Sequence, residues 1–333
     1  MAHLDRAHRA PGDPSTRARQ DVAAPEASAG LVERAENPIL EVVPAVPASD
    51  AQPSPEPAKR KSRAGRNLPA AIGVGVGLGG AVLVSLFFFD RWLFLGLVVV
   101  AVMVGAWEMV RAVSVQKARP PLVPLLIGGP AMVGLAWFGG ADVLPLGLLG
   151  TLLLLFVWRF AGGVQHYQRD VTAGALIAVY VPFLGSFAAL LAYPAADGSV
   201  RVLVTILAVV LSDTGGYVTG VFLGRHKMAP SISPAKSWEG FGGSVVWTAA
   251  GSAVALPLLL PDAVWWHGAV FGAAVSIASV LGDLGESMIK RDLGVKDMSN
   301  LLPGHGGLMD RLDSILLALP TAYAVLAFLV PPS

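Results

Sequence analysis

The stretch GDLGESMIKRDLGVKDMSNLLPGHGGLMDRLD, residues 282–313, places a dense group of charges between two apolar segments. The 333-residue chain is only 14% charged, yet this run holds Asp283, Glu286, Lys290, Arg291, Asp292, Lys296, Asp297, Asp310, Arg311 and Asp313. The flanking residues 265–281 and 314–330 are apolar enough to lie in lipid. We therefore expect a charged site held at a bilayer surface by two membrane helices, which suits a polar reaction performed on a lipid.

The composition of the chain is that of a multispanning membrane protein. Hydrophobic residues make up 54% of the sequence and occur in long blocks. The net charge is +1, which gives no basic field for nucleic acid. Cysteine is absent, so disulfides, thiolate catalysis and cysteine-ligated metal sites are excluded. A metal here would be held by oxygen or imidazole, which favours magnesium, manganese or calcium.

Residues 1–66 are rich in Ala, Pro, Glu, Arg and Ser and poor in aromatic residues. Such a segment buries too little apolar surface to offset the entropy of ordering, so we expect a disordered cytoplasmic tail. Its end is a basic cluster, Lys59, Arg60, Lys61, Arg63 and Arg66, suited to anionic lipid headgroups. Residues 67–333 then form an all-α transmembrane catalytic domain.

About nine apolar segments approach the roughly 20 residues that a spanning helix needs. They are residues 68–89, 92–112, 121–139, 142–159, 171–193, 201–223, 241–260, 264–284 and 312–331. With the N-terminus inside, the connections that face the cytoplasm hold nearly all Lys and Arg, and the outer ones hold only Arg91 and Arg201. This asymmetry predicts a cytoplasm-facing polar site in the cell membrane. Trp265, Trp266 and His267 fit an outer interfacial belt.

Four polar or glycine-rich features lie inside the expected spans. Asp213 is well within residues 201–223, and burying its carboxylate costs at least ~2.5 kcal/mol, so we interpret it as functional, with a protonated, hydrogen-bonded Asp as the alternative. Gly215 and Gly216 should weaken that helix and allow close approach of a ligand or another helix. Glu108 is either a site residue or a snorkelling surface carboxylate. The glycine pattern at residues 73–80 indicates helix packing, not nucleotide binding.

The inner loop at residues 224–243 contains the pattern SPAKSWEG, residues 233–240. Pro230 and Pro234 prevent a continuous helix, and the residues around Trp238 resemble an interfacial turn. The cations Arg225, Lys227 and Lys236 suit phosphate, and Ser231, Ser233 and Ser237 offer hydroxyl groups.

In the opening stretch, Asp283, Glu286 and Lys290 share one helix face, and Asp310 and Asp313 are one turn apart. Carboxylates converging from two helices predict a site for a hard cation such as Mg²⁺, with a solvated salt-bridged loop as the alternative. Glycines on both sides of His305 would let backbone N–H groups and the imidazole approach an anion.

The run SMIKRDLGVKDMSNLLPGHGGLMDRLD, residues 287–313, resembles the C-terminal signature of the phosphatidate cytidylyltransferases, the CDP-diacylglycerol synthases. The SPAKSWEG pattern resembles the family's second motif, and Asp213 with Gly220 and Gly224 matches the preceding helix. The resemblance covers roughly residues 68–331. One departure is DTGGYVTG from Asp213 onward, where the family often has Ala before the aromatic residue, so only local helix geometry is in doubt.

The resemblance implies transfer of a cytidylyl group from CTP to phosphatidic acid, giving CDP-diacylglycerol and pyrophosphate, with Mg²⁺ and room for a second cation. For metal binding we expect Asp213, Asp283, Asp310 and Asp313. The cations and donor expected at the phosphates are Lys236, Lys290, Arg291, Lys296, Arg311 and His305. Further substrate contacts are expected from Ser233, Ser237, Glu239, Ser287, Asp297, Gly306 and Gly307.

Two alternatives stay open at this point. Another CTP-using membrane enzyme, such as a CTP-dependent polyprenol kinase or a synthase acting on ether lipid phosphates, would need similar groups. An ion-coupled transporter could also place an acid beside a Gly-Gly pair, but the sequence has no internal repeat. The Gly- and Ala-rich helices permit a homodimer.

Overall fold

The computed structural model describes residues 68–331 except 90, 164, 194–195, 300 and 302–305. The chain divides into two units, Met1–Arg60 and Lys61–Ser333, and all described residues belong to the second. The expected disordered tail, the basic cluster that ends it and His305 lie outside the described residues.

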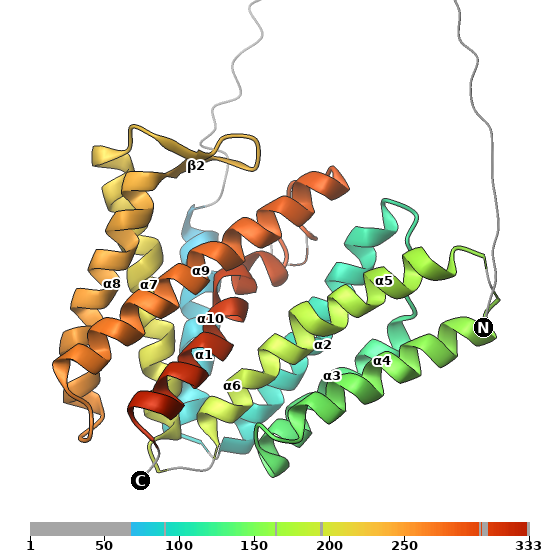
Figure 1. The fold of residues 1–333 in the computed structure, drawn as a ribbon, viewed down its shortest axis with the longest axis horizontal. Coiled ribbons are helices and arrows are strands. Elements are labelled where there is room, and N and C mark those ends of the chain that lie inside the picture. The colour runs from blue at the N-terminus through green and yellow to red at the C-terminus, as the bar shows by residue number, and fades with distance from the viewer. Residues whose placement is uncertain are drawn as a thin grey trace, which may run out of the picture. The chain divides into compact units, whose positions relative to one another are not determined.

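Long apolar helices make up nearly all of the described chain (Figure 1). In order they are α1 Leu68–Phe87, α2 Arg91–Ser114, α3 Leu122–Gly139, α4 Leu144–Ala161, α5 Tyr167–Ala178, the π-helical turn η1 Val179–Phe183, α6 Leu184–Ala192, α7 Gly198–Leu223, α8 Trp238–Leu259, α9 Trp265–Leu293 and α10 Met309–Leu329. A tight turn joins the third and fourth spans, since α3 ends at Gly139 and a turn precedes α4.

Eight helical segments within the described residues are long and apolar enough to cross a membrane, so this is a multi-pass membrane protein. They correspond to the second through ninth expected spans. In the first expected span, residues 68–89, the shorter apolar stretch Gly77–Phe87 is identified within α1. The count of nine therefore stays a prediction, as does the orientation relative to the cytoplasm.

One span contains a change of helical type. Residues Tyr167–Ala192 form a single 26-residue segment in which η1 joins α5 to α6. Pro182 lies in η1 and has no backbone N–H, which disrupts the regular α-helical hydrogen-bond ladder. After the turn, the Ser186 hydroxyl donates to the Pro182 carbonyl oxygen at 2.6 Å.

The α9 helix is longer than the sequence indicated. It has 29 residues and therefore spans about 43 Å, well beyond the roughly 30 Å of a bilayer's hydrocarbon. The apolar run alone suggested an end near residue 284, but the charged residues up to Leu293 continue the same helix. Gly294, with φ of 69°, ends it in the left-handed region. Lys290 and Arg291 in its last turn complement the helix dipole.

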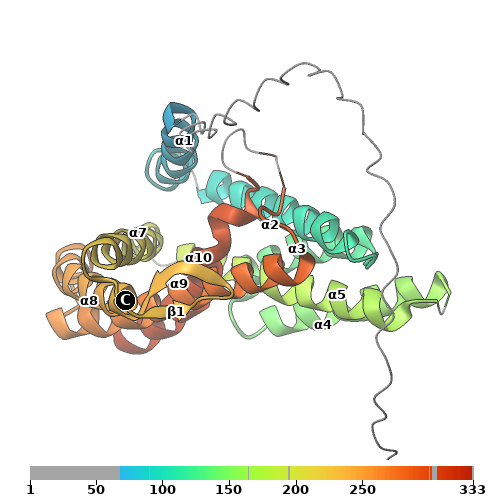
Figure 2. The same cartoon turned by 90° about the horizontal axis from the view of Figure 1, so that it is seen from above.

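Small residues let α7, α8, α9 and α10 pack closely at the part of the fold that carries the site. A Cβ added at Gly272 of α9 would lie 2.4 Å from the Thr248 carbonyl oxygen of α8. A Cβ at Gly282 would lie 2.4 Å from the Asp313 carbonyl oxygen of α10. Figures 1 and 2 both show α7, α8 and α9 side by side, with α10 next to α9. These contacts fix the spacing of the helices that bear the acidic residues.

A short β-hairpin interrupts the helical pattern between α7 and α8. Its strands, β1 Lys227–Ala229 and β2 Ser233–Ser237, pair antiparallel. The expectation of an all-α fold therefore missed this element, although the prolines did exclude a helix. The hairpin lies over the adjoining ends of α7 and α8 (Figure 1).

Candidate active site

A cavity of about 610 Å³ lies where α7, the hairpin, the start of α8, α9 and α10 meet. Cationic and acidic side chains line it in equal number. The cations are Lys236, Lys290, Arg291, Lys296 and Arg311, and the carboxylates are Asp213, Asp283, Asp297, Asp310 and Asp313. Segments that are far apart in sequence thus contribute to one polar chamber among apolar helices.

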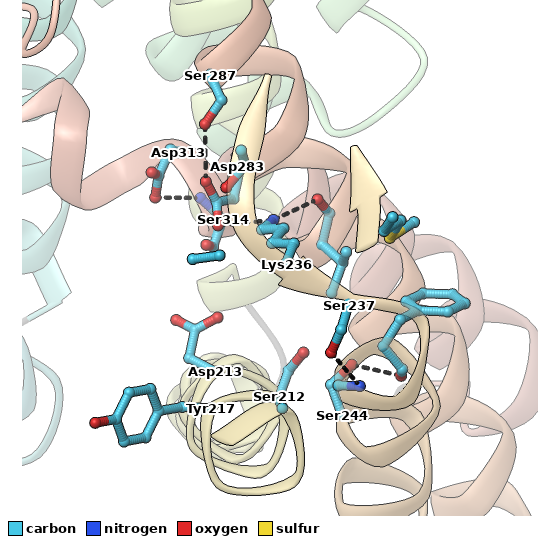
Figure 3. Close-up of a pocket in the computed structure, with 18 of the residues that line it drawn as sticks. Ser212, Asp213, Tyr217, Lys236, Ser237, Ser244, Asp283, Ser287, Asp313 and Ser314 are labelled. Atoms are coloured by element: carbon cyan, nitrogen blue, oxygen red, sulfur yellow. Dashed lines mark hydrogen bonds and ion pairs between the residues drawn. The ribbon is translucent and has the colours of Figure 1, made fainter. Parts of the chain in front are cut away.

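Asp213 enters the cavity from α7, which stays continuous through Gly215 and Gly216. The expected weakening of the helix is therefore not seen. The glycines instead admit α8, because a Cβ at Gly215 would lie 2.6 Å from the Trp247 Cβ. Figure 3 shows the Asp213 carboxylate pointing toward the Asp283 side, and no described group donates a hydrogen bond to it.

Glu239 holds the hairpin in place at its base. Its carboxylate accepts hydrogen bonds from the backbone N–H groups of Arg225, at 3.0 Å, and His226, at 3.1 Å. The His226 Nδ1 lies 2.6 Å from the other Glu239 oxygen. The Ser237 hydroxyl caps α8 by accepting from the Gly240 N–H at 3.1 Å. Glu239 does not line the cavity, whereas Ser233, Lys236 and Ser237 of the SPAKSWEG pattern do. A substrate contact from Glu239 stays a prediction.

The hairpin carries Lys236 to the acids of α9. Lys236 Nζ lies 2.7 Å from Asp283 Oδ2 and donates to the Val280 carbonyl oxygen at 3.2 Å (Figure 3). Both side chains of the pair keep partial exposure, 20% for Lys236 and 34% for Asp283. A substrate in the cavity can therefore reach both groups.

Lys290 is held between two acids deeper in the site. Its Nζ lies 2.9 Å from Asp310 Oδ1 and 3.3 Å from Glu286 Oε1. Glu286 is fully buried, and neither of its oxygens has a hydrogen-bond partner with good geometry among the described residues. Lys290 is its one ion-pair partner there, so two members of the predicted shared face, Glu286 and Lys290, contact each other, whereas Asp283 pairs with Lys236.

Asp310 organises the connector between α9 and α10. Its Oδ2 accepts hydrogen bonds from the backbone N–H groups of Met298, at 3.0 Å, and Gly307, at 2.7 Å. Gly306 has φ of 81°, and a Cβ there would lie 2.9 Å from Asp310 Oδ2. Gly306 and Gly307 thus serve the fold of the connector beside the cavity, and a direct substrate contact from them stays a prediction.

Glu108 reaches the same connector from α2, and the sequence did not predict its role. It is completely buried, which excludes the snorkelling interpretation. Its carboxylate accepts from Ser299 Oγ, at 2.5 Å, and from the backbone N–H groups of Leu308, at 3.0 Å, and Met309, at 2.7 Å. A charged residue within an apolar helix was the only signal, and its partners about 200 residues away could not be deduced.

Most residues expected in the site line the cavity. They are Asp213, Ser233, Lys236, Ser237, Asp283, Ser287, Lys290, Arg291, Lys296, Asp297, Asp310, Arg311 and Asp313. Glu239, Gly306 and Gly307 lie outside the lining. The cavity also contains Ser212, Tyr217, Ser244 and Ser314, which the sequence did not single out because isolated hydroxyl residues in apolar helices are common.

The oxygen ligands in the cavity suit a hard cation, but they are not assembled into a three-ligand site. Within the described residues, no group of three acidic or histidine side chains is close enough to hold one ion. Mg²⁺ commonly uses one or two carboxylates together with water and substrate phosphates. Asp283, Asp213 and Asp313 fit that mode, while Asp310 already accepts from three protein donors.

Comparison with known proteins assigns the chain to a family. The sequence profile of the cytidylyltransferase family matches residues 70–329. A phosphatidate cytidylyltransferase of Mycobacterium bovis is 43% identical over 287 residues, covering 82% of this chain and 93% of the relative. A protein of the same name from Pseudomonas aeruginosa is 34% identical, covering 78% and 96%. A chloroplastic homologue of Arabidopsis thaliana, phosphatidate cytidylyltransferase 5, is 29% identical, covering 80% and 72%. The chain therefore belongs to the cytidylyltransferase family.

Proposed function

We propose that this protein transfers the cytidylyl group of CTP to phosphatidic acid, producing CDP-diacylglycerol and pyrophosphate for phospholipid biosynthesis. The observation that carries the proposal is the cavity in which Lys236, Asp283, Lys290 and Asp213 meet at the ends of apolar helices. The cavity places cationic side chains that can bind phosphate groups directly beside apolar helix surfaces that lipid can contact. The named relatives favour this reaction over the kinase and transporter alternatives.

The reaction joins two anions that repel one another. An oxygen of the lipid phosphate forms a bond to the α-phosphorus of CTP, and the bond from that phosphorus to the oxygen bridging to the β-phosphorus breaks, so pyrophosphate leaves. A phosphate dianion is already a competent nucleophile, so no general base is needed. The protein must therefore align the two phosphates in line and neutralise their charge.

We assign these tasks to the fixed cations of the cavity. Asp283 orients Lys236. Asp310 and Glu286 orient Lys290, so both ammonium groups are held in defined positions. Preorganised cations of this kind stabilise charge that develops in the transition state. Arg291, Lys296 and Arg311, which also line the cavity, would hold the remaining phosphate oxygens, and His305 is expected to donate to one of them.

We further propose that Mg²⁺ is required. The five cations and five carboxylates of the lining cancel in formal charge, so the cavity alone offers no net positive charge to a triphosphate and a phosphate monoester. Asp283 would bind the ion, with Asp213 and Asp313 as further ligands or as hydrogen-bond partners of its water. When bound, Mg²⁺ would neutralise phosphate oxygens and orient the pyrophosphate leaving group.

The topology predicted from Lys and Arg places this cavity on the cytoplasmic side of the cell membrane, where CTP is available. The lipid substrate would enter from the bilayer. A homodimer packed through the Gly- and Ala-rich helices stays a prediction that cross-linking in native membranes would test.

Pyrophosphate release by the purified protein tests the proposed function. We expect release from CTP only when phosphatidic acid and Mg²⁺ are both present, with one CDP-diacylglycerol formed for each pyrophosphate. Diacylglycerol, which lacks the nucleophilic phosphate, is the matched control and should give none. Release that is independent of phosphatidic acid, or formation of CDP in place of pyrophosphate, would contradict the proposal.

A further inference from the structure

Glu108 is a buried carboxylate that the reaction does not use directly. It lies in α2, is completely buried and is absent from the cavity lining. Among the described residues it has no cationic partner. Its hydrogen bonds come from one hydroxyl group, Ser299 Oγ, and from two backbone N–H groups, those of Leu308 and Met309.

These donors identify Glu108 as a cap for α10 that comes from a distant helix. The first N–H groups of a helix have no partner within it, and the residue before α10, Leu308, offers no capping side chain. A carboxylate is favoured at this position because the N-terminal end of a helix carries partial positive charge. Burying a carboxylate that has no cationic partner costs free energy unless the carboxylate accepts hydrogen bonds. The three donors supply these hydrogen bonds to Glu108.

The capped segment carries several residues of the cavity. The first turn of α10 contains Asp310 and Arg311, and Asp313 follows within one turn. Asp310 in turn binds Lys290 and the N–H groups of Met298 and Gly307. A change in the position of this turn would therefore displace acids and a cation together.

Gly307 shows how closely Glu108 and the connector fit. A Cβ at Gly307 would lie 2.8 Å from Glu108 Oε2 and 2.9 Å from Oε1, closer than real Cβ atoms approach other atoms. Only glycine leaves the carboxylate room to reach the two N–H groups that follow. The close approach of Glu108 thus gives a structural reason for the second glycine of the HGG sequence.

We propose that Glu108 is a positioning residue for cytidylyl transfer: it fixes the connector at Ser299 and the first turn of α10 so that Asp310 and Asp313 are held in place in the cavity. The expected effect of Glu108 on turnover rests on the proposed function. The anchoring itself is a property of the fold and can be measured without substrate.

The Glu108→Gln variant tests the anchoring and its consequence in parallel. Glutamine keeps the shape but presents an NH₂ group to backbone donors, so we expect the connector to loosen. The chain has no cysteine, so Leu301→Cys, at an exposed connector position, takes a single spin label. We expect higher label mobility in Glu108→Gln and a loss of kcat of about ten-fold or more, the range seen when groups that orient ligands are removed, with KM for CTP within about two-fold.

Asp170→Asn is the matched control. Asp170 is also a buried carboxylate that accepts a backbone N–H, from Arg119 at 2.8 Å, but it lies away from α10. We expect this variant to leave label mobility unchanged and to keep most of the turnover. Equal loss of turnover in both variants would mean general destabilisation and would overturn the proposal.

The remaining outcomes are also decisive. Unchanged label mobility in Glu108→Gln overturns the anchoring role, whatever the activity, and higher mobility with full kcat overturns the link to catalysis. If Glu108→Gln does not fold, Ser299→Ala removes the hydroxyl that donates to Glu108 and also the hydrogen bond that this hydroxyl accepts from the Leu301 N–H, so the readout for this variant is kcat alone. We expect about a three-fold loss of kcat, within the effect of one such hydrogen bond, and an unchanged kcat would contradict the proposal. Absence of turnover in the unlabelled wild-type protein would refute the proposed function and leave the mobility test intact.

Discussion

Replacing Gly282 with alanine will force α9 and α10 apart at the cavity. The added Cβ would lie 2.4 Å from the Asp313 carbonyl oxygen, whereas ordinary contact begins at 3.4 Å, so the helices must separate by about 1 Å. The obstacle is backbone, which cannot rotate away as a side chain can. A displacement of about 1 Å between reacting groups can cost about 10²-fold in rate. Overpacking of this kind typically costs about 1–3 kcal/mol of stability.

The assay is CDP-diacylglycerol formation by purified protein in mixed micelles, with thermal unfolding measured on the same samples. Gly285→Ala is the matched control, because a Cβ at Gly285, one helical turn away, meets no atom within 4 Å. We expect Gly282→Ala to lose about 100-fold in kcat and Gly285→Ala to keep wild-type turnover. Turnover of Gly282→Ala within about three-fold of wild type would refute the inferred spacing of the two acid-bearing helices.

Three further predictions concern the charged groups. Lys236→Met should reduce turnover about 100-fold, as for loss of one transition-state donor. It should change the free energy of unfolding by less than about 1 kcal/mol, because the ion pair with Asp283 is partly exposed. A large fall in melting temperature with retained turnover would show a structural role instead. Asp283→Asn should abolish metal-dependent turnover in protein that still elutes as a folded species in detergent, and near wild-type rates would reject Asp283 as a ligand. Removal of divalent ions with EDTA should stop the reaction and added Mg²⁺ should restore it, whereas full activity in EDTA would exclude the metal.

Hydropathy and charge predicted the membrane helices because both properties are local. Eight of the expected spans recur as apolar helices, including residues 171–193 despite the π-helical turn at Pro182. The length of α9 was underestimated because the criterion for a span is lipid contact, and a helix can continue past the bilayer on its own backbone hydrogen bonds. The shared helix face predicted for Asp283, Glu286 and Lys290 did indicate that this charged end is helical, and α9 confirms it.

The groups that line the cavity were largely foreseen, but their partners were not. Lys236 and Asp283 were each expected in the site, yet their 2.7 Å pairing depends on how the hairpin folds over α9. The contacts of Glu239 with the backbone N–H groups of Arg225 and His226 were not foreseen either. The capping of α10 by Glu108 joins positions about 200 residues apart, and no local pattern encodes such a contact.

The fate of differently labelled CTP tests the central claim most directly. Purified protein would be incubated with phosphatidic acid vesicles, Mg²⁺ and CTP carrying ³²P at either the α or the γ position. Cytidylyl transfer predicts that the α label enters the lipid fraction while the γ label leaves entirely as pyrophosphate. Entry of the γ label into lipid, or no lipid labelling from α-labelled CTP, would contradict the account.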